Sequence, residues 1–270
     1  MTKTTLNVDT ERFRSGADKY AAYLETPEGR LRLDLAFANL QEFLPQASSL
    51  RALDLGCGTG AIAIRLARLG FQVTLLDCSR PMLDFAERAA REAGLNGRIA
   101  LAEGDAGEVA TLFPAESFDV IICHNVLEYV RDPAAVLRGA ARTLCGPSAI
   151  FSVLVRNQAG EVMKAAIQNG DLAAAEQALI TEWGTESLYG GSVRLFTTQT
   201  LRATVRAASL AVIAGRGIRV VSDYLPSQID QNANYEKIFE LERKLGSRPE
   251  FAGVARYTHW IAHLASSRGE

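Results

Sequence analysis

The sequence Asp54-Leu-Gly-Cys-Gly-Thr-Gly60 places three glycines close together, directly after a short apolar run. Glycine has no Cβ, so such a loop can turn tightly and let its backbone approach a bound ligand. The helical pattern that follows, Ala61–Leu69, would bring the free N–H groups of a helix N-terminus to the same place. Such a place suits an anionic group, for example a carboxylate or a phosphate.

Two cofactors fit this loop. Gly56, Gly58 and Ala61 satisfy the dinucleotide fingerprint, and Asp77 follows at roughly the 20-residue distance at which an acid binds the ribose. The other cofactor is S-adenosylmethionine (SAM), whose methionine carboxylate suits the helix terminus. The glycine pattern alone leaves NAD and SAM both open.

Three further features favour SAM. Asp105 follows the third apolar run, where its side chain could accept a hydrogen bond from an adenine amino group. His124 ends the fourth run, in His124-Asn-Val-Leu-Glu-Tyr129. After the fifth run the chain shows no second mononucleotide-binding half, which an NAD protein of this type would carry.

The elements that must position these residues alternate regularly between strand and helix. Continuous apolar runs, rather than alternating ones, predict a parallel sheet that is buried on both faces. The fold class expected is α/β: a Rossmann-like sheet with helices on both faces and a final antiparallel strand. The strands are expected at 51–55, 71–77, 98–103, 118–124, 148–155, 211–221 and 255–264, with helices from Thr26-Pro27, at 61–69 and 79–93, from Asp132-Pro133, and at 198–209.

We expect one domain over 1–270, with a core of about 46–156 and 193–265. Two irregular segments, about 157–192 and 223–254, are expected to form a lid over the carboxyl ends of the strands, where ligands bind in such sheets. They carry Trp183, Tyr189, Tyr224 and Tyr235, whose rings suit the wall of a partly dry pocket. If they lie elsewhere, the substrate would be expected near 9–23.

Composition excludes several other classes. The chain has 270 residues and a formal net charge of −2, so no overall basic field indicates nucleic-acid binding. The cysteines form no CxxC pair and lie at no zinc-site spacing, and His259 and His263 have no evident third ligand, so no metal is expected. With neither a signal-peptide pattern nor a long apolar run, the expected location is the cytoplasm, with no membrane partner.

Taken together, these motifs resemble the class I SAM-dependent methyltransferases over nearly the whole chain. The resemblance implies that the glycine loop holds the methionine part of SAM, that Asp77 binds the ribose hydroxyls, and that the residues after the third strand contact adenine. The cofactor-binding candidates are Arg32, Asp54, Gly56, Cys57, Gly58, Gly60, Asp77, Cys78, Asp105, Ala106, Gly107 and His124. One departure is the turn before the fifth strand, Leu144-Cys-Gly-Pro-Ser148, where the family often has Pro-Gly-Gly.

A narrower set of segments is similar to the tRNA 5-carboxymethoxyuridine methyltransferase group. They are Gly29–Arg32, His124–Tyr129, Gly217–Tyr224, Tyr235–Glu242 and Arg256–His259. That group esterifies the carboxylate of a modified wobble uridine, and the resemblance implies that Arg32 and His124 contact SAM.

The acceptor is left open between a small molecule and tRNA. Members of the tRNA-modifying group carry a lysine run where this chain has Thr181–Ser192, with two acids and no lysine, and phosphate contacts need cations. Five arginines without an intervening acid between Ser187 and Ser222 partly offset this: Arg194, Arg202, Arg206, Arg216 and Arg219.

The mechanism depends on the atom that accepts the methyl group. This atom is either an oxygen, such as a carboxylate oxygen, or a nitrogen. A carboxylate is ionised at neutral pH and needs no base, whereas a phenol or amine needs one, and His124 is the candidate. Arg219, Tyr224 and Arg256 are candidates for binding a carboxylate substrate, because arginine forks suit that group. A non-catalytic SAM-binding protein is the alternative from another class.

Overall fold

The computed structural model describes residues 8–46, 49–186 and 188–265. Its centre is a sheet of seven strands in the order β3-β2-β1-β4-β5-β9-β8. Strands β1 to β5 are mutually parallel, and β9 runs antiparallel to both of its neighbours, β5 and β8. This confirms the α/β class, the parallel sheet and the final antiparallel strand. The strands are β1 (Arg51–Leu55), β2 (Gln72–Asp77), β3 (Ile99–Glu103), β4 (Val120–His124), β5 (Ile150–Arg156), β8 (Leu210–Ile218) and β9 (Tyr257–Leu264).

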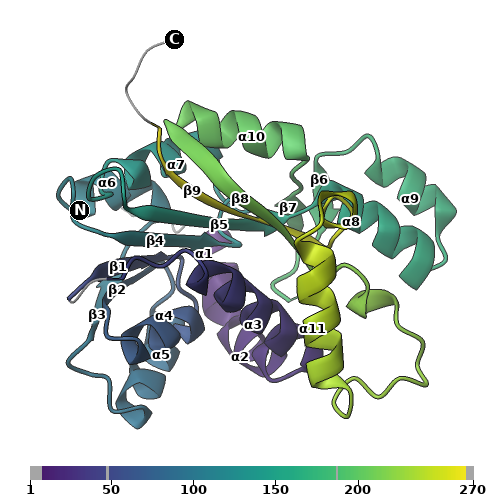
Figure 1. The fold of residues 1–270 in the computed structure, drawn as a ribbon, viewed down its shortest axis with the longest axis horizontal. Helices are drawn as coiled ribbons and strands as arrows, with labels where there is room; N and C mark the ends of the chain where they lie inside the picture. Colours follow the sequence, from purple (N-terminus) through teal and green to yellow (C-terminus); the bar gives the residue numbers. More distant parts are fainter. Residues whose placement is uncertain (1–7, 47–48, 187, 266–270) are drawn as a thin grey trace.

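Helices cover both faces of this sheet, as Figure 1 shows. Alternate strand residues face opposite ways, so Leu53 and Ile121 pack with one set of helices while Ala52 and Val120 pack with the other. The first set includes α6 (Val109–Leu112), which follows the short turn Ala106–Glu108, α7 (Pro133–Ala141) and α10 (Thr198–Ala207). The second set is α3 (Pro27–Gln41), α4 (Ala61–Arg68) and α5 (Arg80–Glu92).

The predicted helix starts are confirmed by their caps. The side chain of Thr26 accepts a hydrogen bond from Gly29 N, and that of Asp132 accepts one from Ala135 N at 2.9 Å. A proline follows each cap, where its missing N–H costs nothing. Ser79 caps α5 in the same way. These starts are encoded locally, which is why the sequence predicted them.

The two helices before α3 were not predicted. They are α1 (Val8–Ser15) and α2 (Ala17–Leu24). Phe13, Ala17 and Tyr20 recur at helical spacing, which is the signal that could have indicated a buried face. These helices pack against α5 and α3, and so come close to the glycine loop.

The two irregular segments contact each other, through Tyr224 Oη to Gly160 O and Asn157 Nδ2 to Gly253 O, but they cover different parts of the fold. Residues 157–192 form α8 (Gln158–Met163), a π-helical turn (Lys164–Gln168), α9 (Leu172–Ala178) and strand β6 (Trp183–Thr185), which pairs with β7 (Ser192–Arg194). Figure 1 shows α8, α9 and β6 together at one end of the molecule.

The second segment packs against α3 and also against β8 and the residues just after its carboxyl end. After a turn at Ser222–Tyr224 it forms α11 (Tyr235–Gly246) and α12 (Pro249–Ala252). Tyr235 and Ile238 pack with Leu31 and Leu35 of α3. No helix in the described part of the chain is both long and apolar enough to cross a membrane.

Candidate functional site

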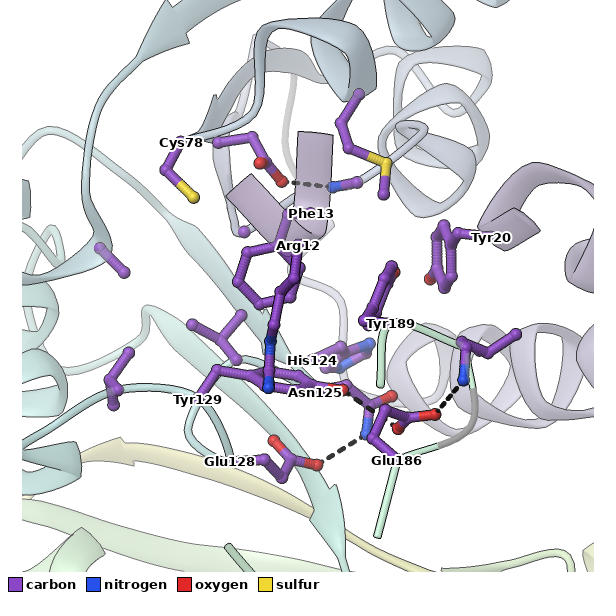
Figure 2. A pocket seen from close by; sticks show the side chains of 18 of the residues that line it. Arg12, Phe13, Tyr20, Cys78, His124, Asn125, Glu128, Tyr129, Glu186 and Tyr189 are labelled. Carbon is purple, nitrogen blue, oxygen red and sulfur yellow. Dashed lines mark hydrogen bonds between the residues drawn. The ribbon is translucent and has the colours of Figure 1, made fainter. Parts of the chain in front are cut away.

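A cavity of about 660 Å³ lies at the carboxyl ends of the parallel strands. Its wall comes from the loops after β1 to β5, from α1 and α2, and from the segment 157–192. Figure 2 shows residues from several of these regions around one space, among them Phe13, Cys78, His124 and Tyr189. The location is the one at which open parallel sheets bind their ligands.

The three glycines of the loop have backbone conformations that residues with a Cβ adopt only with strain. Gly56, Gly58 and Gly60 have φ values of +69°, +53° and +73°. A Cβ on Gly56 would lie 2.4 Å from the Val126 side chain, and one on Gly60 would lie 2.8 Å from that of Leu75. The glycines therefore serve both the turn and the close packing of α4 and the His124–Tyr129 loop.

Asp77 ends β2 and ties that strand to the glycine loop. Its Oδ2 accepts a hydrogen bond from Gly58 N at 2.8 Å, and its Oδ1 accepts one from Ser79 N at 2.9 Å. Burial raises the pKa of this carboxyl, and these hydrogen bonds oppose the rise. Each oxygen can still accept a second hydrogen bond, so Asp77, with Cys78 beside it on the cavity wall, could bind a diol.

The loop after β3 presents Asp105 and Ala106 to the cavity. Asp105 Oδ1 accepts a hydrogen bond from Gly107 N at 2.7 Å and begins the short turn Ala106–Glu108. This bond fixes the carboxylate at the edge of the cavity. Gly107 itself is not part of the described cavity wall.

Arg32 of α3 is buried among aromatic rings. Its guanidinium donates to Asn125 Oδ1 and to Tyr20 Oη, both at 3.0 Å, and lies 5.1 Å from the ring centre of Tyr23 and 5.8 Å from that of Tyr257. It forms no ion pair with any acid in the described ranges. A buried cation without an acid, on the wall of a cavity, is suited to bind an anionic ligand.

A second, small cavity of about 40 Å³ adjoins the first and shares Arg32, Gly56 and His124 with it. Asp54 and Cys57, two of the expected cofactor residues, line this space. Burial, followed by the charge of Asp77, raises the pKa of Asp54 from 3.8 to about 7, against a hydrogen bond from Ala63. The methionine-binding candidates of the sequence thus lie together.

His124 ends β4 and lines both cavities. Its Nε2 lies 2.7 Å from Ser152 Oγ, and its ring meets that of His259 edge-on, with 5.1 Å between the centres. Burial lowers the pKa of this histidine, and the charges of His259 and Arg32 lower it further. The imidazole is therefore neutral at physiological pH.

The other half of the cavity contains charged residues to which the sequence assigned no role. Glu128 Oε1 accepts hydrogen bonds from Asn125 Nδ2 at 2.9 Å and Arg156 N at 2.8 Å, while its buried Oε2 has no hydrogen-bond partner. Burial raises the pKa of this carboxyl. Arg156 forms an ion pair with Glu186 at 2.8 Å.

Arg194 differs from Arg156 in having no acid beside it. Its guanidinium lies 5.1 Å from the ring centre of Trp183, which is half exposed, and both side chains line the cavity. Its Nε is buried without a hydrogen-bond partner, and it forms no ion pair with the acids that the structure describes. Like Arg32, it is a cation available to an anion.

A cluster of aromatic rings forms part of the cavity wall. Phe13 meets Tyr129 edge-on at 5.0 Å and Tyr189 at 5.1 Å, and Tyr189 lies 6.0 Å from Tyr20 (Figure 2). Burial raises the pKa of Tyr129 and of Tyr189. The hydroxyl groups of these two tyrosines therefore keep their protons at neutral pH. The apolar rings restrict the access of water.

Arg219, Tyr224 and Arg256, expected to bind substrate, are not part of the described cavity wall. Arg219 pairs with Asp223 and donates to Tyr23 Oη at 3.0 Å, whereas Arg256 pairs with Glu161. Acids therefore already neutralise both of these charges. Tyr224 and Tyr235 also lie off the cavity, because the segment 223–254 packs on α3.

Nothing among the described residues groups three or more histidine, cysteine, aspartate or glutamate side chains as a metal site would. The cysteines are free thiols, of which Cys57 and Cys123 are buried. The elements of the site that point to a ligand are the glycine loop, two acids at strand ends, and Arg32 and Arg194, which are at least partly buried and form no ion pair with a described acid.

Comparison with known proteins agrees with this geometry. A family model described as a methyltransferase domain matches residues 46–189. The chain is 28% identical to tRNA 5-carboxymethoxyuridine methyltransferase of Escherichia coli (strain K12) and 30% identical to that of E. coli O157:H7, covering 90% of this chain and 92% of each relative.

Solved structures show the same fold. The CcbJ methyltransferase from Streptomyces caelestis matches with a TM-score of 0.66 at 17% identity, covering 96% of this chain and 100% of that one. A SAM-dependent methyltransferase from Mesorhizobium loti matches with a TM-score of 0.60 at 22% identity, covering 86% and 99%. The NAD alternative finds no support in these comparisons. The chain belongs to the class I SAM-dependent methyltransferases, and SAM is its cofactor.

Proposed function

We propose that this enzyme methylates a carboxylate, and that the carboxylate belongs to 5-carboxymethoxyuridine in tRNA. The observation that carries the proposal is the pair Arg32 and Arg194, two cavity arginines with no acidic partner among the described residues. SAM brings one carboxylate, which can pair with one of them. The second arginine then calls for a second anion, and an ionised acceptor supplies it.

The chain would hold SAM from the glycine loop to the loop after β3. Arg32 and the small cavity beside Asp54 suit the methionine end, Asp77 suits the ribose hydroxyls, and Asp105 with Ala106 suits the adenine. When bound, SAM supplies a methyl group that its sulfonium already activates. Gly56 and Gly58, which line the cavity, would allow the backbone to approach the cofactor without a side chain in the way.

The acceptor would occupy the half of the cavity beside Arg194. A guanidinium binds a carboxylate through two parallel hydrogen bonds, which also orients it. The exposed face of Trp183 suits stacking with a nucleobase, which is how proteins bind unstacked bases of RNA. The two side chains would thus recognise the two parts of a modified uridine.

The main catalytic contribution of the protein would then be to position the two reactants. An ionised carboxylate needs no base, so the chain has to align it with the methyl group and exclude water, which can supply roughly 7–11 kcal/mol of the barrier. Phe13, Tyr129 and Tyr189 form the wall that would exclude water. The segment 157–192, which carries Trp183 and Tyr189, would act as a lid. Such an enzyme would work in the cytoplasm.

The test uses tRNA whose methyl esters have been removed with mild alkali. Purified enzyme and SAM are added, the tRNA is digested, and the nucleosides are identified by mass spectrometry. The expected result is loss of 5-carboxymethoxyuridine and gain of its methyl ester. No ester on tRNA, together with turnover of small carboxylic acids, would assign the enzyme to small molecules and overturn the tRNA proposal.

A further inference from the structure

A chain of four polar side chains, three of them buried, runs from the cavity along the face of the sheet that α3 covers and ends on α3. Ser152 Oγ lies 2.7 Å from His124 Nε2 and 2.8 Å from His259 Nε2, and His259 Nδ1 lies 3.4 Å from Asn39 Nδ2. Ser152 and His259 are fully buried, on the neighbouring strands β5 and β9. Such a chain is stable only if every donor meets an acceptor, so its protons are not independent.

The serine hydroxyl has a single proton. It can donate to one imidazole and must accept from the other, so the two Nε2 atoms must be in opposite states: one protonated and one not. Burial and the charge of Arg216 lower the pKa of His259 to about 3, and the pKa of His124 is lowered as well. Both rings are therefore neutral, and each has one proton to place.

Asn39 sets the direction in which the hydrogen bonds of this chain run. Its Nδ2 can only donate, so His259 Nδ1 accepts and His259 carries its proton on Nε2. That proton goes to Ser152 Oγ, and the serine proton goes to His124 Nε2. His124 must then carry its proton on Nδ1, the nitrogen that makes no hydrogen bond within the described residues.

We propose that Asn39, His259 and Ser152 are positioning residues that fix His124 as its Nδ1–H tautomer, so that it offers the cavity a hydrogen-bond donor. In this state His124 has no lone pair for the cavity and is not a general base. The tautomer depends only on the hydrogen bonds of the chain. Its catalytic consequence rests on the proposed function, because a carboxylate acceptor needs a donor and no base, whereas an amine or a phenol would need a base.

Nitrogen-15 NMR of the histidine rings, in the enzyme bound to S-adenosylhomocysteine (SAH), reads the tautomers directly. The expected pattern is a protonated Nδ1 and a free Nε2 on His124, with the reverse on His259. The opposite pattern would mean that Asn39 presents its oxygen and would overturn the proposal. This readout does not involve an acceptor, so it stands even if the proposed acceptor is wrong.

Substitution at Ser152 tests whether the chain sets the tautomer. Ser152→Ala should leave His124 as a mixture of tautomers, whereas Ser152→Thr keeps the hydroxyl and serves as the matched control. We expect kcat to fall about 2- to 12-fold in Ser152→Ala, the value of one hydrogen bond, with SAH affinity retained. If His124 remains fully protonated on Nδ1 in Ser152→Ala, then the chain does not hold it and the proposal is wrong.

Discussion

Asp77 and Gly58 are joined by a hydrogen bond of 2.8 Å, from the glycine N–H to the carboxylate Oδ2. The bond links the end of β2 to the glycine loop after β1, so the residue proposed to hold the ribose also fixes the loop proposed to approach the methionine. Ser79 N donates to the other oxygen, which orients the carboxylate toward the cavity. Cofactor binding and loop geometry should therefore change together at this position.

Asp77→Ala should weaken SAM binding by about 1.5–3 kcal/mol for each charge-assisted hydrogen bond lost. Asp77→Asn keeps one acceptor oxygen and should lose less. Calorimetry with SAM and with SAH measures the effect, and thermal unfolding checks that the variants fold. Unchanged affinity in Asp77→Ala would show that this carboxylate supports the loop alone.

SAM affinity should rise with pH through the neutral range. The pKa of Asp54 is about 7, chiefly because the residue is buried, so part of the free protein holds a proton there. SAM carries an ammonium group, and if that group lies beside Asp54 it favours the ionised form, so binding releases a proton. Affinity should then increase up to about tenfold per pH unit below the pKa.

Asp54→Asn is the control for this linkage. Calorimetry in buffers of different ionisation enthalpy counts the protons released, and the count should fall in the variant. The stability of the free protein provides a second test of the raised pKa of Asp54. A carboxyl whose folded pKa is raised keeps its proton in the folded state, so the free energy of unfolding should decrease as the pH rises from 3.8 to about 7. Equal proton release in both proteins would contradict the placement of the ammonium group.

Arg194→Gln should raise the KM for the acceptor and leave SAM affinity unchanged. One charge-assisted hydrogen bond is worth about 1.5–3 kcal/mol, so kcat/KM should fall about 10- to 150-fold. Arg194→Lys keeps the charge and should be less affected. Arg142→Gln, which removes an exposed arginine at the end of α7, is the matched control and should behave as the unchanged enzyme. An Arg194 variant with normal acceptor kinetics would remove this residue from the acceptor site.

Hydrogen exchange should separate the two irregular segments. Amides in 157–192 should exchange more slowly with SAH bound, because Trp183 and Tyr189 of this segment line the cavity. Amides in 223–254 should change less, because no residue of that segment is part of the described cavity wall. Equal exchange of 157–192 in both states would contradict its role as a lid.

What the sequence predicted correctly was mostly local. The apolar runs of the strands, the glycine loop and the caps Thr26, Ser79 and Asp132 each act within a few residues of themselves. Parallel strands then bring their carboxyl ends to one edge, so Asp77, Asp105 and His124 were expected to meet there, and they do.

The features that the sequence did not predict depend mostly on partners far away along the chain. Arg256 pairs with Glu161, 95 residues away, and no local pattern shows that this charge is neutralised. Arg219 is different, because its partner Asp223 is only four residues further on and could have been noticed. Phe13 and Tyr20 were named only within the fallback range 9–23, because α1 and α2 are short and follow no strand, although their spacing was visible.

The stability of the product toward alkali tests the central proposal, methyl transfer to a carboxylate. The enzyme is given SAM with a deuterated methyl group and its tRNA acceptor, and the product is treated with mild alkali. A methyl ester is hydrolysed under these conditions, whereas a methyl group on nitrogen or on an ether oxygen stays in place. We predict that the label leaves as deuterated methanol and that the carboxylate is restored. A label that remains on the nucleoside after alkali would contradict the account.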